Sequence, residues 1–327
     1  MRALVLSGNG ALALREVPLP SRAGECRIRV RRAGICGTDL QMLEGYAGFN
    51  GIIGHEFVGV VEEASSPDDA AWVGKRVVGD INVGCPSISP TAGRCRWCVV
   101  GVKEHCENRS VLGIRDHDGA FAEFLTLPAS NLHEVPDGVS DDAAVFVEPI
   151  AAACRIFEQL TIDDRTRVAI VGDGRMGLLV AQVLRTATPH VIVLGRHDQK
   201  LGVARALGLE TGLSSAEVTV GERYDVVVDV TGRPDGLRRA LAIVRPRGTV
   251  VMKSTFHGEA PLESWPIVVD EVTLVGSRCG PFRPALALLA AGAVQTTPLV
   301  SKIATLDQFE AAFAEARRSL KVLFAFD

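Results

Sequence analysis

Residues 168–177 read Val-Ala-Ile-Val-Gly-Asp-Gly-Arg-Met-Gly, and an apolar helical segment follows at 178–185. A strand that runs through closely spaced glycines into a helix predicts a dinucleotide-binding loop, because the helix then presents unpaired N–H groups to the phosphates. We expect the first glycine to permit the tight turn, the second to admit the pyrophosphate and the third to bring helix and strand together. A plain turn is the competing interpretation, and the flanking strand and helix favour the nucleotide loop. The expected loop residues are Gly172, Gly174, Arg175, Met176 and Gly177.

Apolar runs on the C-terminal side of this loop alternate with helical segments, at 191–194, 226–230, 249–253 and 273–275. This alternation is typical of a doubly wound parallel sheet, so the sequence predicts an α/β protein with a Rossmann cofactor domain. From residue 1 to about 145 the chain has short β-prone runs separated by Gly and Pro, which indicate a strand-rich, irregular domain. A length of 327 residues is consistent with two domains.

The second strand of the predicted sheet ends at Gly195, and Arg196 follows at once. In sheets of this type that bind NAD, an acidic side chain at that strand end accepts hydrogen bonds from the adenosine ribose. Gly195 leaves room for a 2′-phosphate and Arg196 offers a guanidinium to bind it, so we expect NADP to be preferred. NAD is the alternative if Arg196 is only a solvated charge. Thr231, Gly232 and Ser254 follow later strands and are expected at the same ligand-binding edge.

Three short motifs carry candidate metal ligands. Residues 34–39 read Gly-Ile-Cys-Gly-Thr-Asp, residues 54–56 read Gly-His-Glu, and residues 146–151 read Phe-Val-Glu-Pro-Ile-Ala. A buried cysteine or a core histidine would explain any one of them alone. Together they supply the thiolate, imidazole and carboxylate ligands that hold zinc with one position open. With these motifs, essentially the whole chain resembles the zinc-dependent medium-chain dehydrogenase/reductase family, which includes alcohol, polyol, sugar and threonine dehydrogenases.

The resemblance implies a domain order and an assembly. It implies a GroES-like, strand-rich catalytic domain formed by residues 1–147 and 277–327, with the Rossmann domain at 148–276 inserted between the two parts. The active site would lie in the cleft between these domains. Family members of this kind also imply a homodimer or homotetramer that assembles through the cofactor domains.

The resemblance also assigns metal ligands. Cys36 and His55 would bind the catalytic zinc, and Glu148 would be the third ligand, as in the polyol, sugar and threonine branches of the family. Glu56 would bind the metal directly or exchange with water. Asp39 would orient the ligating imidazole from behind.

A proton path follows from the same resemblance. Thr38 matches the hydroxyl that takes the proton of the alcohol and passes it through the nicotinamide ribose. The next member of the relay is often a histidine, and here that position is Gln41. Because an amide cannot titrate, we expect the proton to leave through water.

Cys95, Cys98 and Cys106 match the last three ligands of the family's structural zinc lobe. The fourth ligand is expected at position 92, which is Ala. Cys85 precedes this position, and an extended loop could fold back to supply its thiolate to a four-thiolate zinc site. The competing interpretation is a degenerate lobe with free thiols or with a metal completed by solvent, and we favour the zinc site.

Composition restricts the partners. The formal net charge is −4, from 35 basic and 39 acidic residues, which argues against a nucleic-acid partner. No apolar run is long enough to span a membrane, and because the first residues are typical of a strand and a turn, we expect no signal peptide. Eight cysteines without a disulfide-like spacing indicate a reducing cytoplasm. We expect His117, with two other loop histidines, at the surface.

These expectations combine into one function with two alternatives. The sequence favours an NADP-preferring, zinc-dependent dehydrogenase that interconverts a small secondary alcohol, polyol or sugar and its carbonyl partner. A primary alcohol or aldehyde reductase with the same machinery is the first alternative. A low-turnover protein that only binds NAD(P) is the second, and the intact ligand motifs argue against it.

Overall fold

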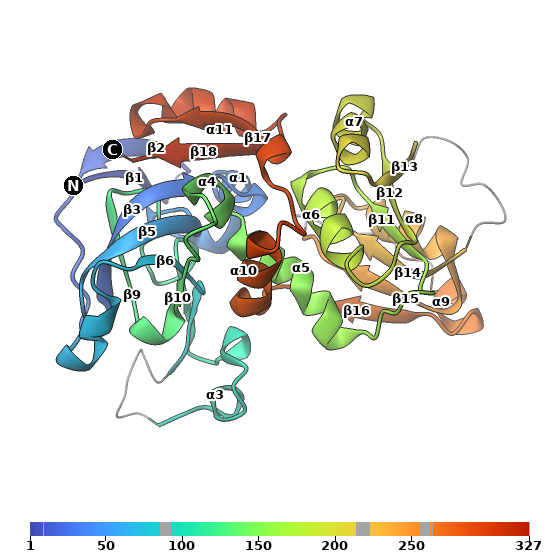
Figure 1. Cartoon of the computed structure of the whole chain (residues 1–327), viewed down its shortest axis with the longest axis horizontal. Helices are drawn as coiled ribbons and strands as arrows, with labels where there is room; N and C mark the ends of the chain where they lie inside the picture. The colour runs from blue at the N-terminus through green and yellow to red at the C-terminus, as the bar shows by residue number, and fades with distance from the viewer. Residues whose placement is uncertain (9, 86–92, 214–222, 256–261, 263, 327) are drawn as a thin grey trace. The chain divides into compact units, whose positions relative to one another are not determined.

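The computed structural model describes residues 1–8, 10–85, 93–213, 223–255, 262 and 264–326 (Figure 1). Contacts divide the chain into two compact units, the first formed by Met1–Glu148 and Val300–Asp327 and the second by Pro149–Leu299. Residues 277–299, which the sequence analysis assigned to the catalytic domain, group with the second unit. They do so because Gly280 lies directly against the backbone of Ala151, and because the Gln182 side chain bonds both the N–H and the carbonyl of Gln295.

The first unit is built on strands. Its larger sheet contains, in spatial order, β10 (Leu132–Glu134), β6 (Arg76–Gly79), β5 (Glu56–Glu63), β3 (Cys26–Gly34), β18 (Lys321–Ala325) and β17 (Val300–Ala304), and β9 (Phe124–Leu127) also pairs with β3. A smaller sheet has the order β2 (Leu12–Glu16), β1 (Arg2–Leu6) and β4 (Gly51–Ile52), and β7 (Asn82–Val83) pairs with β8 (Ser110–Val111). Its helices are short: α1 (Gly37–Met42), α3 (Arg96–Val99), α4 (Asp141–Ala144) and α11 (Phe309–Ala316).

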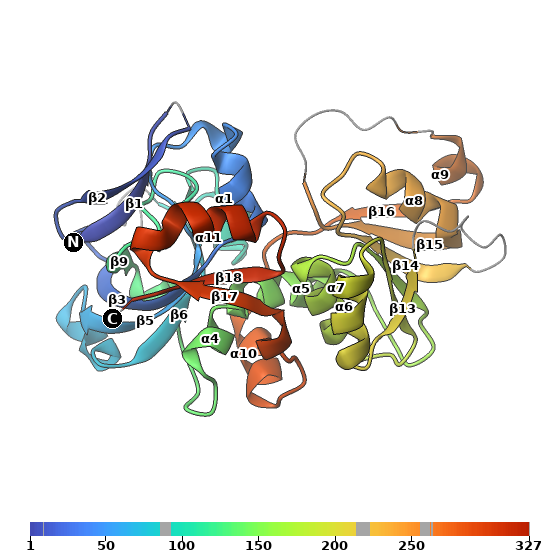
Figure 2. The ribbon, with the colours of Figure 1, turned by 90° about the horizontal axis from the view of Figure 1, so that it is seen from above.

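The last part of the chain is integral to this first unit. β18 lies between β3 and β17, and α11 packs beside β17 and β18 (Figures 1 and 2). Phe324 of β18 packs edge-on against Phe121 with 5.1 Å between ring centroids, and Phe313 of α11 contacts the same ring at 6.0 Å. Such aromatic contacts stabilise beyond the area they bury, so the C-terminal segment is held by the core of the first unit.

The second unit is a parallel sheet with helices. Its strands lie in the order β13 (Glu210–Leu213), β12 (Val191–Gly195), β11 (Val168–Val171), β14 (Tyr224–Asp229), β15 (Val244–Met252) and β16 (Thr273–Gly276). All five pairings are parallel. The strand order reverses between β11 and β14, which is where ligands bind in sheets of this type. The doubly wound parallel sheet predicted from the sequence is therefore confirmed.

The helices of the second unit lie before, between and after its strands in the chain. They are α5 (Val147–Gln159), which begins at the boundary of the units, α6 (Arg175–Leu184), α7 (Asp198–Ala206), α8 (Gly236–Ile243), α9 (Trp265–Val269) and α10 (Phe282–Ala290). Short 3₁₀ helices in the two units lie at Tyr46–Gly48, Pro67–Trp72, Lys103–His105, Ala129–Asn131, Thr297–Leu299 and Leu306–Gln308. Within the described ranges, no helix has the length and hydrophobicity that a membrane crossing requires.

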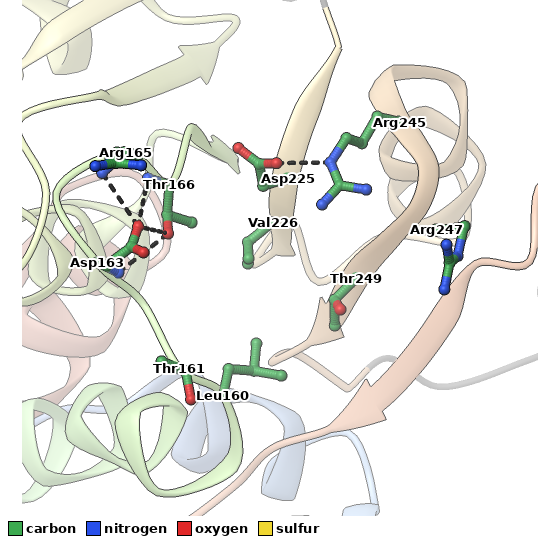
Figure 3. A pocket seen from close by; sticks show the side chains of 10 residues that line it. All are labelled: Leu160, Thr161, Asp163, Arg165, Thr166, Asp225, Val226, Arg245, Arg247 and Thr249. Atoms are coloured by element: carbon green, nitrogen blue, oxygen red, sulfur yellow. Dashed lines mark hydrogen bonds and ion pairs between the residues drawn. The ribbon is translucent and has the colours of Figure 1, made fainter.

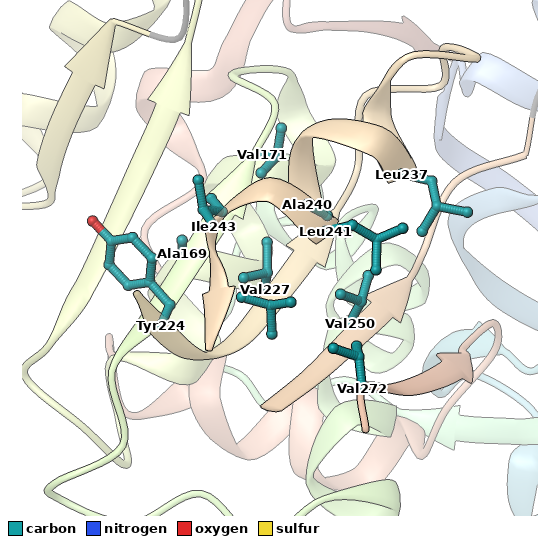
Figure 4. Packing of buried hydrophobic residues seen from close by; sticks show 11 residues of the cluster. Ala169, Val171, Tyr224, Val227, Leu237, Ala240, Leu241, Ile243, Val250 and Val272 are labelled. Atoms are coloured by element: carbon teal, nitrogen blue, oxygen red, sulfur yellow. The ribbon is translucent and has the colours of Figure 1, made fainter. Parts of the chain in front are cut away.

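Branched apolar side chains hold α8 against the sheet. Val227 of β14 and Val250 of β15 are fully buried and pack with Leu237 and Leu241 of α8 (Figure 4). Burying a side chain of this size contributes roughly 1.5–3 kcal/mol. This packing fixes the carboxyl ends of the central strands, and the loops that follow them.

Candidate active site

Two strand ends in the first unit bring the candidate catalytic ligands together. β3 ends at Gly34 and β5 begins at Glu56, and these residues are direct partners in the sheet. Cys36 follows β3 and His55 precedes β5, so both side chains belong to the same end of the sheet. One ligand atom from each of Cys36, His55 and Glu56 lies within 4.8 Å of the others. The structure therefore groups three of the four residues expected to hold a catalytic zinc.

Asp39 lies behind the imidazole of this group. Cys36 is the N-cap of α1, and its backbone N–H donates to Asp39 Oδ2 at 2.7 Å. Asp39 Oδ1 lies 3.3 Å from His55 Nδ1, close enough for charge attraction, although the angle is not that of a hydrogen bond. Both atoms are buried and have no other hydrogen-bond partner. Asp39 thus faces the Nδ1 side of the ring, which leaves Nε2 as the nitrogen suited to a metal.

The protonation of His55 depends on these neighbours. Burial by itself disfavours the imidazolium, but the negative charges of Asp39 and Cys36 outweigh it and raise the pKa of His55 well above its ordinary value. A metal that binds the imidazole of His55 must therefore displace a proton.

Thr38 lies next to the ligand group, with its Oγ1 3.8 Å from Cys36 Sγ. The hydroxyl of Thr38 therefore lies beside Cys36, and its role as the proton acceptor stays a prediction.

Lys321 was missed by the sequence analysis. It begins β18, and its Nζ donates to a carboxylate oxygen of Glu56 and, at 3.2 Å, to the carbonyl of Ile35. The side chains of Lys321 and Glu56 are 0% and 1% exposed, so this is a buried ion pair. Burial lowers the pKa of Lys321 to about 8, and the charges of Cys36 and Asp39 oppose that shift. Only strand register brings these residues together, because they are 265 positions apart.

Glu148 is not brought into the group. It lies in the first turn of α5, half-buried, as the last residue before the boundary between the units. Its carboxylate is not among the ligand atoms that lie within 4.8 Å of one another, whereas the carboxylate of Glu56 is. The described geometry gives Glu56 the nearer carboxylate, and Glu148 as a ligand stays a prediction.

Four cysteines form a second cluster in the first unit. One sulfur from each of Cys85, Cys95, Cys98 and Cys106 lies within 4.8 Å of the others, and Cys85 Sγ is 3.2 Å from Cys106 Sγ. Four sulfurs placed tetrahedrally around zinc would be about 3.8 Å apart, which fits this spread. Cys85 occupies the place expected for a thiolate at position 92, and Ala92 itself lies outside the described residues.

The thiols of this cluster have different acidities. N–H groups of Cys98 and Glu107 lower the pKa of Cys95 to about 6, whereas burial raises the pKa of Cys98 to about 12 and raises that of Cys106 as well. Adjacent sulfurs resist becoming thiolates together, and a divalent cation would remove that resistance. All eight cysteines are unpaired by disulfides. The donor set and its spacing fit a closed zinc site.

The conformation of the glycine loop in the second unit requires glycine at two of its positions. Gly172 has φ +129°, a conformation that side chains rarely adopt. A Cβ at Gly177 would lie 2.0 Å from the carbonyl oxygen of Gly172, so only glycine allows helix and turn to meet. A Cβ at Gly174 would meet no heavy atom within 4 Å, which leaves open space at the N-cap of α6. Arg175 and Met176 begin that helix, so the loop fits a pyrophosphate.

The end of β12 differs from the expectation. Gly195 does not face open space, because a Cβ there would lie 2.5 Å from Asp173 of the glycine loop. Arg196 is not available as a free cation, since its guanidinium is 2.6 Å from Asp235. Asp235 also pairs with Arg233 and Arg239.

The remaining predicted cofactor residues lie at the carboxyl ends of adjacent strands. Thr231 and Gly232 follow β14, and Ser254 follows β15. Gly232 N–H donates to Ser254 Oγ at 2.8 Å, so the two loops are joined. Thr231 Oγ1 donates to Asp229 at 2.8 Å. The structure places these residues at the edge of the sheet that carries the glycine loop.

A pocket of about 340 Å³ in the second unit lies on the side of the parallel sheet opposite to the glycine loop (Figure 3). Thr166 and Val226 in its wall lie close to the amino ends of β11 and β14, and Thr249 of β15 pairs with Val226. Two of its charged groups are paired with each other, as Arg245 is 2.6 Å from Asp225. Because the glycine loop is at the opposite strand ends, this pocket is not the dinucleotide site.

His117 is buried, which contradicts its predicted surface position. It is 4% exposed, and its Nε2 lies 3.0 Å from Glu25. Thr126 donates to the same carboxylate at 2.6 Å. Burial would raise the pKa of Glu25, but the hydrogen bond and charge of His117 outweigh burial and lower it. A polar loop sequence hid this contact because Glu25 is distant in the chain.

Comparisons with known proteins agree with both units. The chain matches the family model of the alcohol dehydrogenase GroES-like domain at residues 22–137 and that of the zinc-binding dehydrogenase at residues 176–291. It is 30% identical to L-threonine 3-dehydrogenase of Streptomyces coelicolor, over 97% of this chain and 96% of the relative.

Solved structures extend this similarity to the fold. An Escherichia coli protein described as a short chain alcohol dehydrogenase, complexed with NADH, has a TM-score of 0.89 at 27% identity, covering 100% of this chain and 99% of its own. A Sinorhizobium meliloti protein bound to NADP has a TM-score of 0.88 at 28% identity, covering 99% of both chains.

A strand-rich unit with a Cys-His-Glu group and a parallel sheet with a glycine loop together define a zinc-dependent alcohol dehydrogenase that uses a nicotinamide cofactor. The chain belongs to the zinc-dependent medium-chain dehydrogenase/reductase family. One structural neighbour holds NADH and another NADP, so the neighbours support a nicotinamide cofactor without deciding between the two.

Proposed function

We propose that the protein interconverts a small secondary alcohol, polyol or sugar and its ketone or aldehyde, with zinc at Cys36, His55 and a carboxylate. The observation that carries this proposal is the convergence of Cys36, His55 and Glu56 within 4.8 Å. The orphaned buried atoms of Asp39 and His55 support it, because a bound metal would hold the imidazole from its other side.

The chain's own residues would divide the work at this site. Zinc would act as a Lewis acid toward the substrate oxygen, and the nicotinamide would accept the hydride. Thr38 Oγ1 takes the hydroxyl proton, and Gln41 cannot pass it on by titration, so water receives it. Asp39 fixes the ring of His55. Lys321 neutralises Glu56 and keeps that buried carboxylate in place.

The carboxylate that completes the zinc site is either Glu56 or Glu148. Glu56 is grouped with the other ligands, whereas Glu148 matches the family motif. We propose that Glu148 joins when the metal binds, since Lys321 already holds Glu56. The Cys85, Cys95, Cys98 and Cys106 cluster would hold a second, structural zinc, because four thiolates leave no ligand position for a substrate.

The substrate class is supported by chemistry and by similarity. Relatives of the chain include an L-threonine 3-dehydrogenase, whose name indicates oxidation at a carbon bearing a hydroxyl.

The preference for NADP expected from Gly195 depended on an unpaired Arg196 guanidinium, and Asp235 already binds that group. This pairing weakens the case for NADP.

A homodimer or homotetramer is proposed for the assembly. β16 is an edge strand of the parallel sheet. Trp265, Val268 and Val269 of α9 are 62%, 73% and 69% exposed, an apolar surface that a second copy could cover. Light scattering on a size-exclusion column tests this directly, and a monomer at micromolar concentration would contradict it.

One experiment separates the three candidate functions. Purified protein with measured zinc content is assayed in both directions against secondary alcohols, polyols, sugars, primary alcohols and aldehydes, with either dinucleotide. Turnover of secondary substrates that is lost in Cys36→Ser supports the proposal. Turnover confined to primary alcohols and aldehydes indicates the reductase, and dinucleotide binding without turnover indicates a low-activity binding protein.

A further inference from the structure

A carboxylate lies at the end of β12, although the strand itself ends in Gly195 and is followed directly by Arg196 and His197. It belongs to Asp173, the second residue of the glycine loop. Its Oδ2 accepts the backbone N–H groups of Arg196 and His197, both at 2.7 Å. A Cβ on Gly195 would lie 2.5 Å from Asp173 Oδ2, so the strand end has room for this carboxylate only because residue 195 is glycine.

The carboxylate of Asp173 is ionised, and part of its capacity to accept hydrogen bonds is already used. Burial would raise the pKa of Asp173, but the donors from Arg196 and His197 outweigh burial and lower it. Oδ2 receives both backbone N–H groups, whereas Oδ1 contacts only the imidazole of His197, at 3.0 Å. A carboxylate oxygen has two lone pairs, so Oδ1 retains capacity to accept from a hydroxyl.

The groups that a 2′-phosphate would need are occupied at the same place. Arg196 and His197 direct their N–H groups to Asp173. The guanidinium of Arg196 lies on Asp235, at 2.6 Å. A phosphate at the end of β12 would therefore meet the carboxylate of Asp173 in place of unpaired donors. The two negative charges would repel each other.

We propose that Asp173 replaces the missing acidic residue at the end of β12, accepts a hydroxyl of the adenosine ribose of NAD and repels the 2′-phosphate of NADP. This inference rests on the proposed dehydrogenase function. It reverses the sequence-based expectation, because that expectation treated Gly195 as open space. The selectivity comes from a side chain of the glycine loop itself.

The test measures binding without an alcohol present. Dissociation constants of NADH and NADPH are determined from dinucleotide fluorescence with the zinc-loaded protein and its variants. We expect the wild type to bind NADH at least tenfold more tightly than NADPH. Asp173→Asn keeps the size of the side chain and removes its charge. It should lower the ratio of the NADPH to the NADH dissociation constant at least tenfold, mainly because NADPH binds more tightly. Arg196→Ala is the matched control and should change the ratio less than twofold.

A second variant tests the proposal independently of any folding defect that Asp173→Asn causes. Asp173→Ser combined with Gly195→Asp moves the carboxylate to the strand end and should restore the preference for NADH. A wild type that prefers NADPH, an unchanged ratio in Asp173→Asn, or a selective loss of NADPH binding in Arg196→Ala would each overturn the inference and leave the dehydrogenase proposal standing. If the wild type binds neither dinucleotide, the proposed function fails, and the inference fails with it.

Discussion

The buried pair of Lys321 and Glu56 makes the sharpest stability prediction. Lys321→Met removes the positive charge and keeps an unbranched side chain that can still pack over Phe146, whose ring centre lies 5.6 Å from Lys321 Nζ. Because Glu56 is 1% exposed, its carboxylate would be left buried beside Cys36 and Asp39 without the positive charge of Lys321. Breaking a buried pair in this way costs about 3–5 kcal/mol.

The loss should be visible in thermal and urea unfolding. For a domain of this size, each kcal/mol shifts Tm by about 2–4 °C, so Lys321→Met should lower Tm by about 6–20 °C. Urea unfolding followed by far-UV circular dichroism, at matched zinc content, gives the free energy of unfolding. Glu56→Gln/Lys321→Met removes both charges of the pair and should recover most of the loss.

Two results would refute this reasoning. If Lys321→Met unfolds within about 0.5 kcal/mol of the wild type, as ordinary surface substitutions do, the pair does not stabilise the first unit. If the double variant is as unstable as Lys321→Met, the loss arises from packing and not from an uncompensated charge.

The other predictions concern metal, catalysis and pH. Purified protein should hold about two zinc ions per chain, and Cys85→Ser should release one of them and lower Tm while the other stays bound; a single zinc in the wild type would contradict the four-thiolate site. Cys36→Ser should abolish turnover without changing the dissociation constant of the dinucleotide, and Thr38→Val should cut turnover with zinc retained; activity in a verified zinc-free Cys36→Ser would rule out the mechanism. Because the pKa of Glu25 is lowered in the folded state, its contribution to stability is fully present above the ordinary value of 4.5 and is lost as the pH falls through the lowered one. Glu25→Gln should therefore show a flatter decline in urea midpoint between about pH 5 and pH 3, and equal acid sensitivity in variant and wild type would show that His117 does not stabilise the charged carboxyl.

The parallel sheet was predictable because its signals are local. The apolar run at 168–171 is observed as β11, and the helix after the glycines begins at Arg175. A buried parallel strand has to be apolar along its length, and a glycine loop has a fixed spacing, so both can be read from adjacent residues. β13 was not predicted, since Glu210–Leu213 is short and partly exposed at the sheet edge.

The contacts that sequence could not predict depend on register and on side-chain direction. Nothing near Lys321 signals Glu56, and the two meet because β18 and β5 both pair with β3. Asp173 was read as a loop position, yet its side chain points to the next strand end. The grouping of residues 277–299 with the second unit likewise depends on Gly280 fitting against α5, which no periodicity encodes.

The order of synthesis gives the place of β18 a further consequence. A ribosome delivers residues 149–299 as one continuous stretch, so the second unit has all its strands before translation reaches β17. The first unit, although it is begun earlier, lacks β17 and β18 until residues 300–325 emerge from the exit tunnel. Until then residues 32–34 of β3 lack their partner strand β18 and Glu56 lacks Lys321, so a nascent chain carries its ligand group in an incomplete sheet. The first unit is therefore begun before the second and completed after it. A chain that terminated before β17 would have the complete parallel sheet of the second unit and a first unit without β17 and β18.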